Sequence, residues 1–192
     1  MTKKKRARAA PAVAVLTVLA ICAALVCAGL LGFRLFQRQT HPIKYEEYVE
    51  RYSQEFGVDK FFVYAVIKTE SGFRPDARSN VGARGLMQIM EQTFDWLKFK
   101  QGDEREAYSD MYDPETNIRY GCYLLGYLVD EFGSEETAAA AYHAGRGQVN
   151  EWLADSSISA DGVHLDKIPI RDTAHYVSKV EKAKAVYLSL YG

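Results

Sequence analysis

The stretch of sequence that decides the fold runs from Asp113 to Gly133 and reads DPETNIRYGCYLLGYLVDEFG. It opens with an aspartate, whose side chain can cap a helix, and then a proline, which suits the first helical position. The glycine at its end is common just beyond a helix. Small and apolar residues keep helical spacing for four turns between them: Ile118, Gly121, Cys122, Leu125, Leu128, Val129 and Phe132. The stretch therefore predicts one long helix with an apolar face.

The segments on either side of this stretch also show helical periodicity. Before it, residues 45–56 carry one apolar stripe, and Asp59 can cap a second helix that reaches residue 70. A short helix is expected at 86–98. After it, helices are expected from Ser134 to Gly145 and from about 172 to 190. Because no strand pair or internal repeat is evident, the expected fold class is mostly α.

The N-terminus has a different composition from the rest of the chain. Residues 1–8 carry five basic side chains, whereas residues 9–33 contain no charged residue. Those 25 residues exceed the ~20 that a helix needs to span a bilayer. We therefore expect a basic cytoplasmic segment at 1–8, a single transmembrane helix at 9–33 and a stalk at 34–44. The positive-inside rule then places residues 34–192 outside the cell membrane.

A cleaved signal peptide and a lipoprotein signal are the two alternatives to an anchor at this N-terminus. A cleaved signal peptide has a shorter apolar core, of about 7 to 15 residues, whereas the apolar run here continues to Phe36 with Arg34 as its one interruption. Val26 and Ala28 form only a weak cleavage site, so the anchor is the preferred reading. A lipoprotein signal is rejected because Ile21 and Val26, rather than small residues, precede the two cysteines of the span.

Charge and cysteine content narrow the function classes. Residues 41–192 hold all 25 acidic residues and 17 of the 24 basic ones, a net charge of −8. This acidic charge argues against nucleic acid as a partner. Cys122 is the one cysteine outside the span, so residues 34–192 cannot form an internal disulfide. No metal site and no cofactor are expected, and no protein partner is indicated.

Glu70 is the most informative single residue. It continues the apolar face of its helix at three, four and seven residues beyond Ile67, Val66 and Val63. Desolvation disfavours the charged form of a carboxyl and raises its pKa, so Glu70 could donate a proton near neutral pH. The alternative is a glutamate that forms a salt bridge or lies on a frayed helix end, with Lys68 nearby.

The segment after Glu70 strengthens this interpretation, and residues 70–90 read ESGFRPDARSNVGARGLMQIM. Its glycines at 72, 82 and 85 allow positive φ or a close approach of the backbone to a ligand. Met87 and Gln88 are expected at the start of the next helix. The amide of Gln88 both donates and accepts hydrogen bonds, which suits an N-acetyl sugar. The alternative is an ordinary helix–loop–helix with a methionine in its core.

Four motifs in this order resemble those of the lytic transglycosylase domain, of the soluble-lytic-transglycosylase and goose-type-lysozyme lineage. The family carries E-S, G-L-M-Q, A-Y-N-x-G and a late Y-V-x-K-V, and the resemblance covers roughly residues 45–190. The corresponding residues here are Glu70-Ser71, Gly85-Leu86-Met87-Gln88, Ala141-Tyr142-His143-Ala144-Gly145 and Tyr176-Val177-Ser178-Lys179-Val180, with Asp113 to Ile118 and Gly121 in the central helix. The resemblance implies a lysozyme-like α-helical catalytic domain at 45–192.

The resemblance also implies roles for individual residues. Glu70 would be the sole catalytic acid, and the Tyr176 hydroxyl would hydrogen-bond it. Ser71 would steady the loop or the carboxylate. The implied substrate contacts are Ser79, Met87, Gln88, Tyr142 and His143. For Tyr142 and Tyr176 the alternative role is that of core aromatics at helical spacing.

Three positions depart from the family pattern. His143 stands where the family usually has asparagine, so the contact made there differs from the family pattern, and no metal role is expected for this lone histidine. Glu91 replaces a proline, and Leu124 stands where tyrosine is frequent. None of these departures removes the acid.

The resemblance implies cleavage of peptidoglycan strands between N-acetylmuramic acid and N-acetylglucosamine, with formation of a 1,6-anhydro ring. The first alternative is a hydrolytic muramidase, which would need a second carboxylate such as Asp95, Asp110 or Asp113. The second alternative is a non-catalytic glycan-binding component of an envelope assembly, against which Glu70, Gln88 and Tyr176 argue.

Overall fold

The computed structural model describes residues 9–102 and 105–192, with side chains from residue 13 onward. The basic segment expected at 1–8 lies outside the described residues. The chain divides into two compact units, one that ends at Pro42 and one that runs from Ile43 to Gly192. Each is described by itself below.

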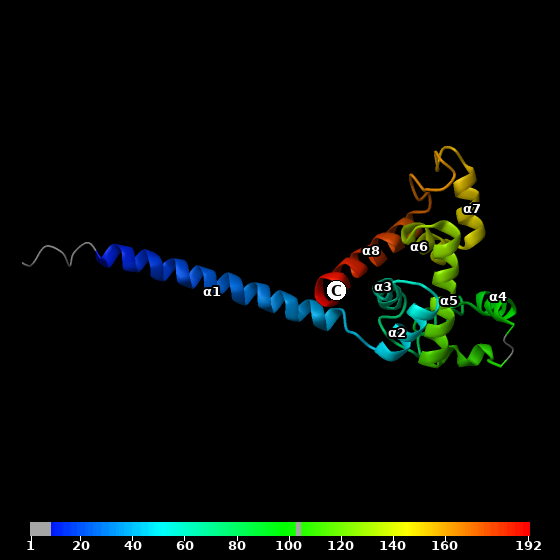
Figure 1. Cartoon of the computed structure of the whole chain (residues 1–192), viewed down its shortest axis with the longest axis horizontal. Coiled ribbons are helices and arrows are strands. Elements are labelled where there is room, and N and C mark those ends of the chain that lie inside the picture. Colours follow the sequence, from blue (N-terminus) through cyan, green and yellow to red (C-terminus); the bar gives the residue numbers. More distant parts are fainter. Residues whose placement is uncertain (1–8, 103–104) are drawn as a thin grey trace, which may run out of the picture. The chain divides into compact units, whose positions relative to one another are not determined.

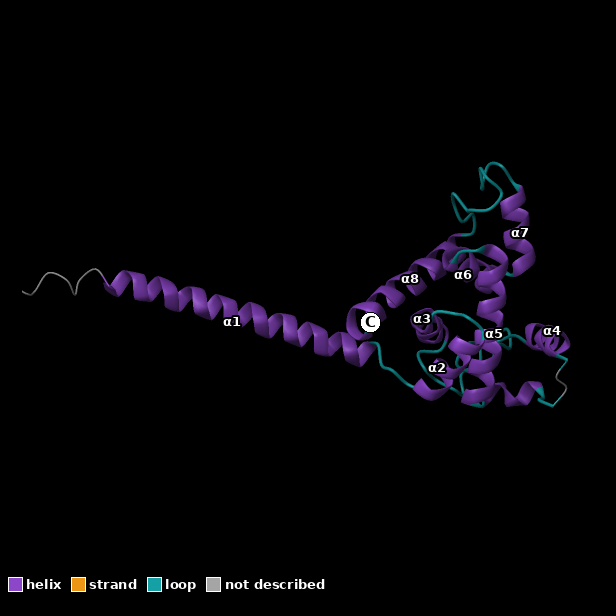
Figure 2. Cartoon of the chain, viewed as in Figure 1, coloured by secondary structure: helices purple, strands orange, loops and turns teal. Residues whose placement is uncertain are grey.

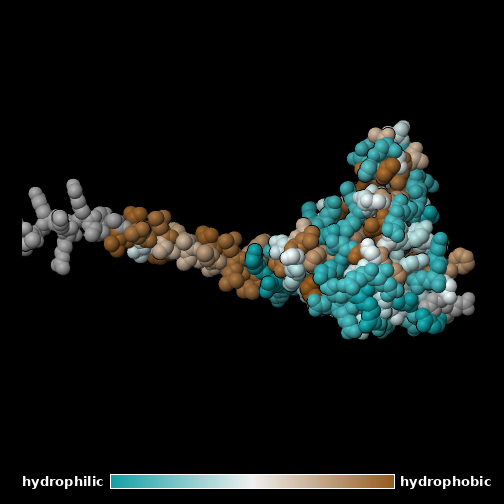
Figure 3. Space-filling view, in the orientation of Figure 1, coloured by the Kyte–Doolittle hydropathy of each residue, from teal (hydrophilic) through white to brown (hydrophobic). Residues whose placement is uncertain are grey.

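The first unit is a single long helix, α1 (Ala9–Thr40). Its apolar side chains are exposed over most of its length, and Figure 3 shows them as a nearly continuous apolar surface. Among the described residues, α1 is the one helix long and apolar enough to cross a membrane. It continues through residues 34–40, most of the segment expected to form a stalk, and the boundaries of the span remain a prediction.

The second unit consists of helices joined by loops, as Figures 1 and 2 show, and the expected mostly α fold is confirmed. The part of the unit that the structure describes contains isolated β-bridges but no strand. Its elements are α2 (Glu46–Glu55), α3 (Lys60–Glu70), α4 (Glu91–Gln101), the 3₁₀ helix η1 (Tyr108–Tyr112), α5 (Pro114–Phe132), α6 (Glu135–Ala144), α7 (Arg146–Ala154) and α8 (Arg171–Tyr191).

The sequence signals for helix ends are confirmed where polar side chains cap them. The Asp59 carboxylate accepts a hydrogen bond of 2.7 Å from the Phe61 amide at the start of α3. The Asp113 carboxylate accepts one of 2.9 Å from the Thr116 amide at the start of α5. Gly133 ends α5 with a φ of 65°, a conformation that favours glycine.

The core lies between α3, α5, α6 and α8. The side chains of α3 from Phe61 to Ile67 are all buried, and this helix packs most extensively against α8. Helix α6 packs against both α5 and α8. Because α3 is enclosed from Phe61 to Ile67, its last turn, which ends at Glu70, lies at the boundary between core and solvent.

The helix expected at 86–98 is wrong at its start, because α4 begins at Glu91 and ends at Gln101. Gly85 and Gln88 have positive φ angles of 79° and 49°, which an α-helix does not allow. Met87 and Gln88 therefore lie in a tight turn, closed by β-bridges of Arg84 with Arg78 and Ile89. Sequence periodicity also missed the short helices η1 and α7.

A substitution at Gly126 tests the packing of α5 against α2. A Cβ at this position would overlap the carbonyl oxygen of Phe56, which is backbone and cannot move aside cheaply. We expect Gly126→Ala to destabilise the domain by about 1 to 2 kcal/mol, because the overlap outweighs the better helix propensity of alanine. Chemical unfolding of the purified chain measures the change.

Gly147→Ala in α7 is the matched control, since a Cβ there meets no atom within 4 Å. It should be neutral or slightly stabilising. Equal stability changes for the two variants would contradict the packing described for α5.

Candidate active site

Glu70 occupies the last position of α3 and is half-buried. Burial raises the pKa of its carboxyl from an ordinary 4.5 to about 7, and the nearby Tyr176 hydroxyl opposes this effect by lowering the pKa. The carboxyl can therefore hold its proton near neutral pH and release it without a large cost. This is the property required of a general acid that later acts as a base.

Ser71 connects the end of α3 to the turn at residues 85–88. Its buried hydroxyl lies 2.7 Å from the Leu86 carbonyl oxygen and 3.2 Å from that of Ile67. The first contact spans 15 residues of sequence, so it fixes the turn beside the last residue of α3. The hydroxyl thus links the turn to α3, and the role expected for this serine in the site remains a prediction.

The turn itself is built around the buried side chain of Asn117, on α5. Its carboxamide oxygen accepts a hydrogen bond of 2.7 Å from the Met87 amide. Its nitrogen donates to the carbonyl oxygens of Arg84 (3.0 Å) and Met111 (2.8 Å). Gly85 is required next to it, because a Cβ at that position would overlap the Met111 carbonyl and the Asn117 amide. Asn117 belongs to the central-helix motif of the sequence, but the motif alone predicted no role for it.

Met87 points into the core rather than toward solvent. Its side chain is fully buried and packs against Gly121, where a Cβ would overlap the Met87 sulfur. This burial does not favour the expected substrate contact, which remains a prediction. The exposed methionine of the segment is Met90, at the start of α4, with 39% of its surface accessible. Sequence reasoning did not single out Met90.

Ser79 and Gln88 both make hydrogen bonds within their own loop. The Ser79 hydroxyl accepts from the Ala83 amide at 3.0 Å. The Gln88 side-chain nitrogen donates to the carbonyl oxygens of Gly85 (2.8 Å) and Ala77 (3.1 Å). Both side chains are partly exposed, and their contacts with substrate remain predictions.

Two tyrosines flank Glu70. The Tyr142 hydroxyl, from α6, donates to the Met87 carbonyl oxygen at 2.6 Å. Burial and the nearby Glu70 carboxylate raise the pKa values of both Tyr142 and Tyr176 well above their ordinary value. Among the described residues, the buried Tyr176 hydroxyl has no hydrogen-bond partner of good geometry, although it is near enough to Glu70 to lower the pKa of that carboxyl. His143 lies beside Tyr176, with ring centroids 4.6 Å apart.

A groove adjoins Tyr142 and has a volume of about 290 Å³. Helices α4, α5, α6 and the start of α7 form its walls. Its lining combines an aromatic ring, polar groups and a cation, and includes Gln92, Thr93, Trp96, Tyr142 and Arg146. Such a mixture of apolar and polar groups suits a carbohydrate ring with its hydroxyl and amide substituents.

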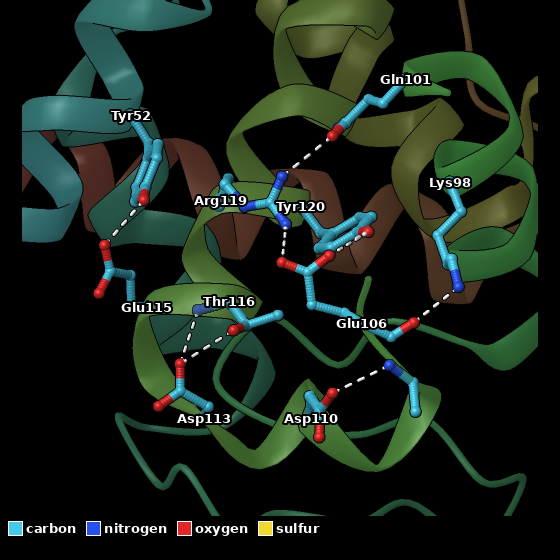
Figure 4. A network of polar contacts seen from close by, with 11 residues as sticks. Tyr52, Lys98, Gln101, Glu106, Asp110, Asp113, Glu115, Thr116, Arg119 and Tyr120 are labelled. Atoms are coloured by element: carbon cyan, nitrogen blue, oxygen red, sulfur yellow. Dashed lines mark hydrogen bonds and ion pairs between the residues drawn. The ribbon is translucent and has the colours of Figure 1, made fainter. Parts of the chain in front are cut away.

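Two of the three carboxylates considered for a second catalytic role, those of Asp110 and Asp113, accept hydrogen bonds from nearby backbone amides instead. Asp110 accepts a hydrogen bond from the Ala107 amide, and Asp113 accepts from Thr116 (Figure 4). Asp95 is exposed on α4 and does not line the groove. In the part of the chain that the structure describes, no group of three or more His, Cys, Asp or Glu side chains could hold a metal ion.

Comparison with known proteins points to the same family as the sequence motifs. Residues 47–163 match the family described as the transglycosylase SLT domain. The chain is 34% identical to the soluble lytic murein transglycosylase of Escherichia coli (strain K12), over 86% of this chain and 26% of that protein. It is 35% identical to the membrane-bound lytic murein transglycosylase C of Sodalis glossinidius, over 55% of this chain and 32% of that protein.

A solved structure shows the same fold. It is that of an inactive glutamate-to-glutamine mutant of lytic transglycosylase Slt from Pseudomonas aeruginosa. It superposes with a TM-score of 0.67 at 29% identity, over 78% of this chain and 25% of that one. The chain therefore spans about a quarter to a third of the length of these relatives.

The raised pKa of Glu70 predicts a pH-dependent gain of stability in Glu70→Gln. The folded protein holds the Glu70 proton more tightly than the unfolded chain, so wild-type stability falls as pH rises from about 4.5 to about 7. Glutamine does not titrate. At pH 8 the variant should be more stable by about 2 to 3 kcal/mol, and at pH 4 the two should be equal. Chemical unfolding at both pH values measures this difference.

Glu151→Gln, at an exposed glutamate of α7, is the matched control and should follow the wild type. A constant difference between wild type and Glu70→Gln across this pH range would show that the carboxyl is not held neutral by burial.

Proposed function

Because the chain belongs to the transglycosylase SLT domain family, we propose that its residues 45–192 cleave peptidoglycan strands as a lytic transglycosylase. The observation that carries the proposal is the half-buried Glu70 carboxyl, with a pKa of about 7, near Tyr176 and near Tyr142, the second of which lines a groove of suitable chemistry. A related protein inactivated by a glutamate-to-glutamine change supports the essential role of one glutamate.

In the first chemical step, Glu70 donates its proton to the glycosidic oxygen between N-acetylmuramic acid and N-acetylglucosamine. The bond from the anomeric carbon to that oxygen breaks, and the N-acetylglucosamine side leaves with a hydroxyl group. The N-acetyl group of the substrate stabilises the positive charge at the anomeric carbon. Glu70 is now ionised, and burial makes it a stronger base than an exposed glutamate.

In the second step, the Glu70 carboxylate removes the proton from the muramoyl O6 hydroxyl. That oxygen bonds to the anomeric carbon and closes the 1,6-anhydro ring without water. Glu70 ends the cycle protonated, so a single carboxyl is enough. The use of Asp110 and Asp113 as local caps favours this route over a hydrolase, which needs a second carboxylate.

The groove beside Tyr142 would hold one sugar unit of the strand. We assign glycan contacts to the partly exposed Ser79 and Gln88, and to Tyr142 at the groove wall. Met87 supports the turn. Its side chain is buried, and its carbonyl oxygen accepts a hydrogen bond from the Tyr142 hydroxyl.

The long apolar α1 and the membrane-bound relative indicate association with a membrane. We propose the finer arrangement that the charge pattern predicts, with α1 as a single-pass anchor of the cell membrane. The basic N-terminal residues would then lie in the cytoplasm and residues 34–192 outside.

Product analysis tests the proposed chemistry. Wild-type chain should release muropeptides that end in 1,6-anhydro-N-acetylmuramic acid, lighter by one water than the products of a hydrolase. Glu70→Gln should abolish cleavage, because glutamine can neither give nor take the proton. Asp95→Asn is the control and should retain activity, since Asp95 does not line the groove. Mass spectrometry of digested peptidoglycan reads out both results.

Two results would count against this chemistry. Reducing-end products would indicate a muramidase, and substantial cleavage by Glu70→Gln would remove Glu70 from the mechanism.

Fractionation of cells tests the anchor. Because the apolar run of α1 is uninterrupted to Phe33, the mature protein should keep its N-terminus and stay in the membrane after a carbonate wash. A mature, soluble form that begins near Gly29 would instead identify a cleaved signal peptide.

A further inference from the structure

His143 projects from the last turn of α6 and contacts α8 at two points. Its Nδ1 atom lies 3.1 Å from the hydroxyl oxygen of Thr173, a polar side chain that is 99% buried. Its ring lies against the ring of Tyr176, with centroids 4.6 Å apart and planes inclined by 32°. Thr173 and Tyr176 are three residues apart and therefore share one face of α8. A single imidazole thus joins α6 to this face.

The Tyr176 ring needs such support because its hydroxyl is held by no hydrogen bond of good geometry among the described residues. The position of a tyrosine hydroxyl is then set by whatever packs against the ring. The hydroxyl is close enough to Glu70 to lower the pKa of that carboxyl. A small movement of the Tyr176 ring would therefore change the environment of the Glu70 carboxyl.

We propose that His143 is a positioning residue, which holds the Tyr176 ring so that its hydroxyl faces Glu70. This inference rests on the proposed function of Glu70 and gives His143 a role other than the substrate contact expected from the sequence. The histidine acts on the reaction through Tyr176. The hydrogen bond to Thr173 fixes the imidazole, and the imidazole fixes the phenol.

The charges around His143 are consistent with a neutral ring in this role. Burial lowers the pKa of the imidazole, while Asp172, on α8, raises it. The carboxyl of Glu70, at the end of α3, lies near the hydroxyl of Tyr176. A neutral imidazole can stack on a phenol and exchange a hydrogen bond with a hydroxyl while the residue stays exposed to solvent, as His143 is.

A double-mutant cycle on the full-length chain tests the proposal. We expect Tyr176→Phe to lower kcat by about tenfold to a hundredfold, the usual value of a hydrogen bond to a charged group, because the hydroxyl would donate to the Glu70 carboxylate once the acid has given up its proton. His143→Ala should lower kcat by about threefold to tenfold with KM unchanged. In the Tyr176→Phe background, where no hydroxyl remains to be positioned, His143→Ala should have no further effect.

Two conservative variants distinguish the stacking of the His143 ring on Tyr176 from its hydrogen bond with Thr173. His143→Phe retains an aromatic ring against Tyr176 and should keep most of the activity. His143→Gln retains a hydrogen-bonding group but no ring, and should resemble His143→Ala. Thermal melting of each variant confirms that the domain is folded.

A second readout does not require catalysis. The pKa of Glu70, measured by carbon NMR with labelled glutamate, should rise in both His143→Ala and Tyr176→Phe, because the same hydroxyl contact is lost. If the wild-type chain cleaves no peptidoglycan, the proposed function fails and this readout alone decides the role of His143.

The proposal is overturned if His143→Ala lowers activity equally with and without the Tyr176 hydroxyl, or raises KM alone, as expected for a substrate contact. It is also overturned if His143→Ala leaves the pKa of Glu70 unchanged while Tyr176→Phe raises it.

Discussion

The desolvation of one carboxyl, that of Glu70, is the constraint on which the rest of the site depends. Helix α3 is enclosed from Phe61 to Ile67, so its last residue emerges where the core ends. The environment there favours the neutral acid but still admits the ionised form, with a pKa of about 7. A fully exposed glutamate would be ionised at neutral pH, and a completely enclosed one would have no access to substrate.

The loop beside Glu70 is held by hydrogen bonds to its backbone and by the side chains of Leu86, Met87 and Ile89, which are buried in the core of the domain. Asn117 uses both ends of its amide on this loop, and Ser71 and Tyr142 each bind one further carbonyl. A buried polar side chain is stabilising when its donors and acceptors are matched, and costly when one partner is lost. The geometry around Glu70 therefore depends on residues that need never touch the substrate.

Sequence reasoning predicted the features that local signals determine and missed those set by tertiary contacts. The caps at Asp59 and Asp113 and the burial of the face that leads to Glu70 depend on nearby residues, and the structure confirms them. Helical periodicity does not reveal the start of α4, because Gln88 has a positive φ and its side chain donates a hydrogen bond to the carbonyl oxygen of Ala77, 11 residues away. The buried role of Asn117 was hidden in the same way, because its partners lie 6 to 33 residues away.

The pKa of Glu70 in the unliganded protein is the most direct test of this account. Carbon NMR of the chain labelled at the glutamate carboxyl, with Glu70→Gln to assign the signal, measures it across pH 3 to about 9. We expect Glu70 to titrate near pH 7, well above the ordinary glutamate value of 4.5. A titration near the ordinary value of 4.5 would contradict it, because Glu70 would then be ionised at neutral pH and unable to donate the proton on which the proposed cleavage depends.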